Sequence, residues 1–390
     1  MNKTTLSRVN AFEPAVAYQM VADPDEGVVL VHQYGNTTQV PAISEPNAYG
    51  QSGCGAISTL GLARVVGSVA TQVQLGSVTL PVSVAMDDLG PVVIDAGALN
   101  DGSLTSEFLE DDGVLDSPFF DVFTDVVSSC GISARSVFGG SAGFRDGRQV
   151  VAVVSTPSGI WVQSRDPWQV VGPAVQVSLP GPNPKDSGHD LFHERAGASI
   201  ACATCHAEGG DDGLVWLFDG VIPRRTHDLR GGILATAPFH WDGAHADMKA
   251  IMDDAFTSRM NGPFLNSSYA GAVATWVDSV AMPASHLGAL DADVLAGKAL
   301  FERADVGCAS CHGAPLFTNN QSVDVGTGGS FQVPSLVGVG RRVSYLHDGC
   351  APDLERAIRG EACTVSDFGA HGAVSSLSAA ELAQLVAYLR

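Results

Sequence analysis

The sequence predicts a multidomain protein with an N-terminal all-β part, followed by a C-terminal all-α part made of two tandem modules. Up to about residue 180, short apolar runs alternate with Gly, Asp, Asn and Pro and show no helical periodicity. A proline-rich linker follows at 173–184, and beyond it one residue pattern occurs twice. The expected domains are therefore 1–180, 181–284 and 285–390.

The β-rich part is interpreted as a partial, propeller-like domain. At 25–31, 88–94 and 146–153 a polar turn that contains glycine adjoins a short strand, as in propeller blades, and 158–165 adds another turn and strand. About three or four blades are too few to close a ring, and an open ring leaves sheet edges unpaired. A β-sandwich is the alternative, because the spacing between these units is long and irregular.

Two C-x-x-C-H motifs, at 202–206 and 308–312, carry the strongest chemical signal. In this spacing two thiols form thioether bonds to the vinyl groups of one haem, and the adjacent imidazole binds its iron. A zinc or redox C-x-x-C turn is the weaker reading, because neither motif has two further clustered Cys or His ligands. We expect two covalently bound haem c groups, held by Cys202, Cys205, His206, Cys308, Cys311 and His312.

The surroundings of the two motifs predict an internal duplication. An Asp-Gly pair follows Cys202 by 40 residues at Asp242, and another follows Cys308 by 40 residues at Asp348. Asp247 and Asp353 lie five residues further along, and each precedes a run with helical character.

Two further helices have recognisable starts. A helix is expected over 287–301, with Asp291 or Asp293 as its cap, because a carboxylate satisfies the N–H groups of the first turn. Ser378 and Glu381 form a capping box for a C-terminal helix with one apolar face.

The segment from about 188 to 390 resembles the di-haem cytochrome c peroxidase/MauG superfamily. The motifs that carry the resemblance are the two C-x-x-C-H sequences, 237–243 (APFHWDG), 258–262 (SRMNG), 333–336 (VPSL), 345–349 (YLHDG) and the C-terminal helix.

The resemblance implies that electrons from a small redox protein, a cytochrome c or a cupredoxin, enter at the His312 haem. They then pass Trp241 and reach the His206 haem, where hydrogen peroxide is reduced. Calcium is considered as a further cofactor, beside the two haems. The alternatives are a non-catalytic electron-transfer cytochrome and a MauG-like oxidase of a protein or organic substrate.

The distal iron ligands distinguish these functions, because a six-coordinate iron carries electrons whereas an open iron binds peroxide. Met260 either binds the first iron or borders the peroxide pocket. His371 or His347 takes the place of the family's second-module methionine, the alternative for each being a structural hydrogen bond. Arg259 stands where the resembled peroxidases carry an acid, which favours the non-catalytic alternative.

Other polar residues have supporting roles in this reading. Asp253 and Asp254 are nearby acids that could replace the missing one, and Trp241 is otherwise a plain core residue. Arg224, Arg225 and Arg230 either neutralise haem propionates, since a guanidinium pairs with two carboxylate oxygens, or are solvated.

The net charge of −21 argues against binding nucleic acid or an anionic membrane surface. It suits docking to a basic partner, although a merely solvated acidic surface explains it equally well. No segment is long and apolar enough to span a bilayer.

A c-type cytochrome is assembled on the oxidising side of the inner membrane, so we expect a periplasmic or otherwise exported protein. The first residues lack a signal peptide, which predicts a mature form or a start further upstream. In that compartment Cys350 with Cys363, and Cys54 with Cys130, are the expected disulfides.

Overall fold

The chain forms two compact units, the first made of residues 1–207 and 253–269 and the second of residues 208–252 and 270–390. The computed structural model describes residues 12–23, 27–37, 40, 49, 57–75, 80–87, 90–95, 114–116, 149–183, 186–194, 196, 200–218, 223–285, 291–360 and 371–390.

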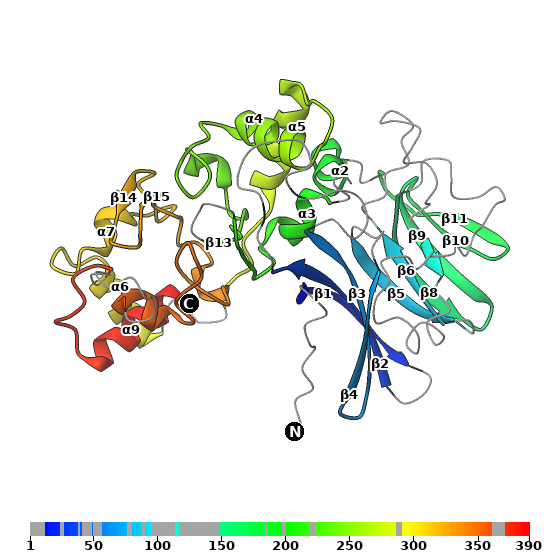
Figure 1. The fold of residues 1–390 in the computed structure, drawn as a ribbon, viewed down its shortest axis with the longest axis horizontal. Coiled ribbons are helices and arrows are strands. Elements are labelled where there is room, and N and C mark those ends of the chain that lie inside the picture. The colour runs from blue at the N-terminus through cyan, green and yellow to red at the C-terminus, as the bar shows by residue number, and fades with distance from the viewer. Residues whose placement is uncertain are drawn as a thin grey trace. The chain divides into compact units, whose positions relative to one another are not determined.

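The N-terminal part consists of three antiparallel sheets in which strands follow in chain order, β1-β2-β3-β4, β5-β6-β7 and β8-β9-β10-β11 (Figure 1). This confirms the β-rich character predicted from the short β-branched runs. The strands are Phe12–Asp23 (β1), Gly27–Asn36 (β2), Ser58–Val66 (β3), Val69–Leu75 (β4), Pro81–Asp87 (β5), Gly90–Asp95 (β6), Val114–Asp116 (β7), Gln149–Thr156 (β8), Gly159–Asp166 (β9), Gln169–Gly172 (β10) and Val175–Ser178 (β11).

The first strands of successive sheets lie next to one another. The backbone N–H of Val84 in β5 donates to Oε1 of Gln19 in β1 at 2.7 Å. The N–H of Val153 in β8 donates to Oγ of Ser83 in β5 at 3.1 Å. Apolar side chains of β5, β6, β8 and β9 form one core between two of the sheets. Each sheet is thus an up-and-down meander, the strand order of a propeller blade; a propeller itself stays a prediction.

The predicted linker is wrong at its beginning. Val175–Ser178 forms β11 and pairs in antiparallel fashion with Gln169–Gly172. A turn at Pro173 and Ala174 reverses the chain, and the β-branched Val175 and Val177 then extend the sheet.

The C-terminal part contains short helices together with two two-stranded sheets, so the prediction of an all-α region is too simple. The helices are Ser187–His193 (α2), Cys202–Cys205 (α3), Ala207–Gly209 (η2), Ile233–Thr236 (η3), Met248–Ile251 (α4), Met252–Arg259 (η4), Ser267–Ser279 (α5), Ala292–Phe301 (α6), Cys308–Cys311 (α7), Val339–Arg341 (η5), Leu354–Arg359 (α8) and Ala379–Leu389 (α9). The strands are Val215–Trp216 (β12), Arg224–Arg225 (β13), Ser322–Asp324 (β14) and Ser330–Gln332 (β15).

The backbone repeats itself in the two modules, as the duplicated sequence pattern predicts. Asp247 caps α4 by accepting from the N–H of Ala250 at 2.9 Å, and Asp353 caps α8 by accepting from the N–H of Arg356 at 2.8 Å. An isolated antiparallel bridge precedes each cap, one between Phe239 and His245 and one between Tyr345 and Ala351.

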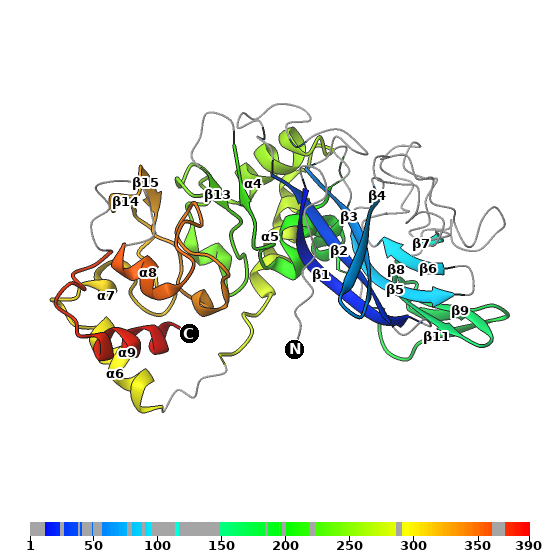
Figure 2. The ribbon, with the colours of Figure 1, turned by 60° about the horizontal axis from the view of Figure 1, so that its bottom comes forward.

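Helices α6 and α9 pack side by side (Figures 1 and 2). Gly297 permits this approach, because a Cβ at this position would lie 1.9 Å from the carbonyl oxygen of Gln384. The predicted caps are confirmed, since Asp291 caps α6 and Ser378 with Glu381 forms a capping box on α9. Within the described residues, no helix has the length and apolar character needed to cross a membrane.

Candidate functional site

Both C-x-x-C-H motifs fold in the same way. The cysteines of each motif begin and end a four-residue helix, and none of the four forms a disulfide. The N–H of His206 donates to the carbonyl of Cys202 at 2.9 Å, and that of His312 donates to the carbonyl of Cys308 at 2.9 Å. The backbone angles of the two histidines also agree, at φ −114°, ψ 60° and φ −104°, ψ 54°.

The imidazole of His312 is arranged as a metal ligand would be. Its Nδ1 donates to the carbonyl oxygen of Phe317 at 2.9 Å, which leaves the lone pair of Nε2 as the acceptor. Burial lowers the pKa of His312 to about 4, so the ring is neutral at physiological pH. These features fit a haem iron bound to Nε2.

Of the two predicted distal histidines in the second module, His371 lies beside His312. Their ring centroids are 6.0 Å apart. Two imidazoles on opposite sides of one metal, with metal–nitrogen bonds of about 2 Å, have centroids about 6 Å apart. His347 instead stacks on Phe331 with a centroid distance of 4.0 Å and meets Trp241 edge-on at 6.2 Å.

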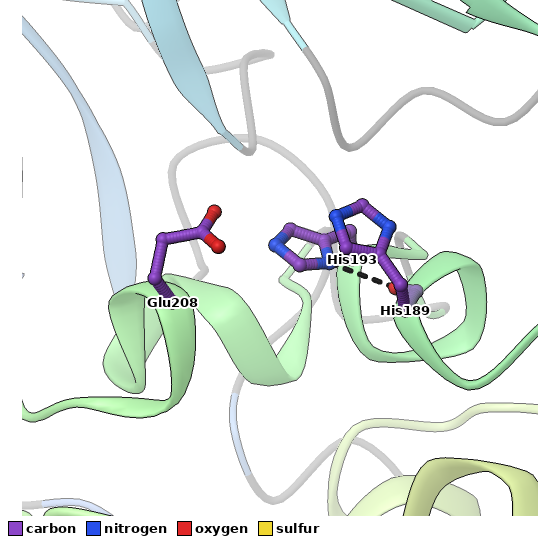
Figure 3. A group of neighbouring side chains, drawn as sticks. All are labelled: His189, His193 and Glu208. Atoms are coloured by element: carbon purple, nitrogen blue, oxygen red, sulfur yellow. Dashed lines mark hydrogen bonds between the residues drawn. The ribbon is translucent and has the colours of Figure 1, made fainter. Parts of the chain in front are cut away.

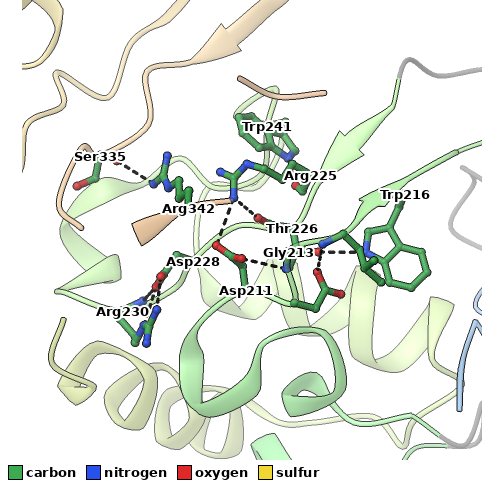
Figure 4. Close-up of polar contacts among 12 residues, drawn as sticks. Asp211, Gly213, Trp216, Arg225, Thr226, Asp228, Arg230, Trp241, Ser335 and Arg342 are labelled. Carbon is green, nitrogen blue, oxygen red and sulfur yellow. Dashed lines mark hydrogen bonds and ion pairs between the residues drawn. The ribbon is translucent and has the colours of Figure 1, made fainter. Parts of the chain in front are cut away.

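Trp241 is buried in the second unit among polar and aromatic groups (Figure 4). Its Nε1–H donates to the carbonyl oxygen of Arg225 at 2.8 Å. The ring of His227 lies 3.9 Å away, and the guanidinium of Arg225 is 5.7 Å from the indole centroid. An indole held by one hydrogen bond and packed between rings is rigid, which suits electron transfer as well as a core role.

The predicted propionate-binding arginines already have partners. Arg225 forms an ion pair with Asp211 at 3.3 Å, and Arg230 makes a two-point contact with Asp228 at 3.0 and 2.5 Å (Figure 4). Arg224 lies over the ring of Phe331 at 5.1 Å. Sequence reasoning missed Arg342, the other arginine of this region in Figure 4.

Arg259 and Met260 lie at the end of the π-helix η4. Arg259 Nε donates to Asp254 Oδ2 at 3.1 Å, so the arginine is paired with one of the two acids that were predicted nearby. Met260 is buried, and its N–H donates to the carbonyl of Ala255 at 2.9 Å. Tyr49 was missed by the sequence reasoning. Its N–H donates to the carbonyl of Arg259 at 3.1 Å, and the guanidinium lies 6.0 Å from its ring.

Two further histidines form a stacked pair on α2. The rings of His189 and His193 have centroids 3.9 Å apart, and His193 Nδ1 donates to the carbonyl of His189 at 2.8 Å. Figure 3 shows the pair together with Glu208, the second residue after His206. The guanidinium of Arg165 contacts His189 Nδ1, which disfavours a cation there.

Cys350 forms a disulfide, as the sequence predicts. Cys363, Cys54 and Cys130 lie outside the described residues, so both pairings stay predictions.

Asp212 is a buried carboxyl whose Oδ1 accepts from the N–H of Leu214 at 3.0 Å. Burial raises the pKa of Asp212 to about 6, above an unfolded value of about 4. The folded chain therefore binds this proton more tightly, so stability falls as pH rises from about 4 to about 6 and levels off above. We expect Asp212→Asn to remove this fall and to stabilise the chain at neutral pH by about 3 kcal/mol.

Urea unfolding of both proteins across this pH range measures the effect. Asp324→Asn is a matched control, because the exposed Asp324 also accepts from an N–H two residues ahead, at 2.8 Å. Parallel pH profiles for wild type and the Asp212 variant would contradict the prediction.

Comparison with known proteins gives structural likenesses only. No family model and no curated protein matches the chain. Hydrazine synthase of Kuenenia stuttgartiensis has a TM-score of 0.45 and 22% identity, covering 52% of this chain and 85% of its own.

A MauG-like protein associated with microbial copper homeostasis has a TM-score of 0.40 and 18% identity, covering 54% of this chain and 90% of its own. The diheme peroxidase BthA from Burkholderia thailandensis has a TM-score of 0.34 and 14% identity, covering 62% of this chain and 92% of its own. The proposals below therefore depend on the chain's own residues.

Proposed function

We propose that this chain is an exported di-haem c-type cytochrome that reduces hydrogen peroxide, with electrons relayed from the second haem to the first. The observation that carries the proposal is the repeated motif geometry, in which a four-residue helix bounded by two cysteines outside any disulfide ends at a histidine. Zinc or dithiol chemistry does not require this histidine, whereas haem attachment does.

The residues of the second module suit an electron-transfer centre. Cys308 and Cys311 provide the two thioether attachments, and His312 is held in the tautomer that exposes Nε2. His371, whose ring centroid lies 6.0 Å from that of His312, would supply the second ligand to the iron. With both histidines bound, the iron would be closed to peroxide, so this module would carry electrons.

The residues of the first module include groups that suit peroxide reduction. When bound, haem iron supplies one-electron chemistry and an open coordination position for peroxide. The reaction consumes one peroxide, two electrons and two protons and releases two waters. Arg259 is a fixed cation that can stabilise negative charge on the departing oxygen, and Asp254, at 3.1 Å from it, can accept and return a proton.

The electron donor is proposed to be a small redox protein, a cytochrome c or a cupredoxin. The disulfide at Cys350 supports an oxidising compartment such as the periplasm. Binding of calcium stays a prediction. So does the alternative activity, oxidation of a protein or organic substrate.

The second candidate function is electron transfer without catalysis. Two observations favour it: Arg259 is engaged in an ion pair, and the buried Met260 next to it is a thioether that could close the first iron. In that case both irons would be six-coordinate and inert to peroxide.

Spectroscopy of the chain purified from a cytochrome-maturing host distinguishes the two. We expect one high-spin and one low-spin ferric signal by electron paramagnetic resonance, with the high-spin signal lost on adding peroxide. Two low-spin signals that ignore peroxide and cyanide would establish the second candidate. A chain without thioether-bound haem by pyridine haemochrome and mass spectrometry would overturn both.

A further inference from the structure

Arg342, a residue of the second unit, does not use all of its guanidinium N–H groups in hydrogen bonds to the described residues. Its Nη2 donates to the carbonyl oxygen of Ser335 at 3.2 Å (Figure 4). Its Nε is buried and has no hydrogen-bond partner among the described residues. A guanidinium carries five N–H donors and is always charged, so a buried, unused Nε points to an acceptor that occupies this place in the working protein.

Short hydrogen bonds connect Arg342 to the loop that holds His312. The residue that accepts from Arg342, Ser335, donates its Oγ–H to the carbonyl of Leu316 at 2.7 Å. The next carbonyl, that of Phe317, accepts from His312 Nδ1 at 2.9 Å. The guanidinium is therefore close to the second haem-binding motif.

Arg342 has no carboxylate partner among the described residues, because the nearby carboxylates pair with other arginines. Asp211 is paired with Arg225 and Asp228 with Arg230, and no ion pair of Arg342 exists among the described residues. Burial and the neighbouring charge of Arg225 lower the pKa of Arg342 to about 10. A buried cation next to another cation is costly unless an anion joins them.

We propose that Arg342 binds a propionate carboxylate of the second haem and raises the reduction potential of that haem. This inference depends on the proposed di-haem function. A positive charge next to an iron disfavours the more positive ferric state, so it favours the ferrous state. The guanidinium is partly buried, so its charge is screened less than that of an exposed side chain.

Replacing Arg342 by glutamine tests the proposal, with the adjacent Arg341→Gln as its matched control. Arg341 is exposed, and its guanidinium donates to the carbonyl of Ala284. We expect R342Q to weaken reduction of the second haem about tenfold, a fall of about 59 mV in its reduction potential by spectroelectrochemical titration. R341Q should change neither haem by more than about twofold, since its charge is screened by solvent.

Arg342→Lys serves if the glutamine variant folds poorly. Lysine keeps the charge but loses the planar fork, so we expect a smaller fall in the same haem. Unchanged potentials in R342Q, or equal shifts in R341Q and R342Q, would overturn the proposal. Pyridine haemochrome counting separates this failure from failure of the proposed function, because two haems per chain must be present in every variant.

Discussion

Replacing Cys308 and Cys311 together by alanine should halve the haem content of the purified chain, from two covalent haems to one. Each thiol of the motif forms one thioether bond, so the double variant has no covalent attachment left in the second module. Both thiols are free and bound the helix α7 that positions His312. Pyridine haemochrome against protein concentration measures the haem count, and mass spectrometry locates the remaining group.

The mirror variant, with Cys202 and Cys205 replaced by alanine, should lose the other haem. Ser310→Ala is the control, because Ser310 lies between the two cysteines of the second motif and leaves their spacing intact. Two haems retained in either double variant would refute covalent attachment at that motif.

His371→Ala should convert the second haem from low spin to high spin. The ring of His371 lies 6.0 Å from that of His312, and burial lowers its pKa, so the neutral, ligating form is present at physiological pH. Without it the iron keeps one imidazole, and a weak-field or open position gives a high-spin ferric signal. Electron paramagnetic resonance and the optical spectrum of the oxidised protein measure this change.

His347→Ala decides between the two histidines that the sequence left open. Its Nε2 is buried without a hydrogen-bond partner among the described residues, but its ring stacks on Phe331 and contacts Trp241. We expect this variant to stay low spin at the second haem. The reverse result, high spin in the His347 variant and low spin in the His371 variant, would show that His347 is the ligand.

Helix starts that depend on interactions between residues close in the sequence could be predicted well. The helical runs after Asp247 and Asp353, the cap at Asp291 and the capping box at Ser378 are confirmed. In each case a side chain satisfies a backbone N–H within a few residues, so local sequence is sufficient. The prediction of a linker from residue 173 onward was wrong at its beginning. Val175–Ser178 pairs with β10 as strand β11, although prolines precede and follow this strand.

The sequence by itself determined the two C-x-x-C-H motifs, their duplication and the β-rich N-terminal part. Only the tertiary structure brought His371 next to His312, and only it connected Arg342 to Ser335 and left its Nε unused. The first relation joins segments that are far apart in the chain, and the second depends on how the loop around Arg342 folds. Their distances follow from how helices and loops pack, a property that no local spacing of residues encodes.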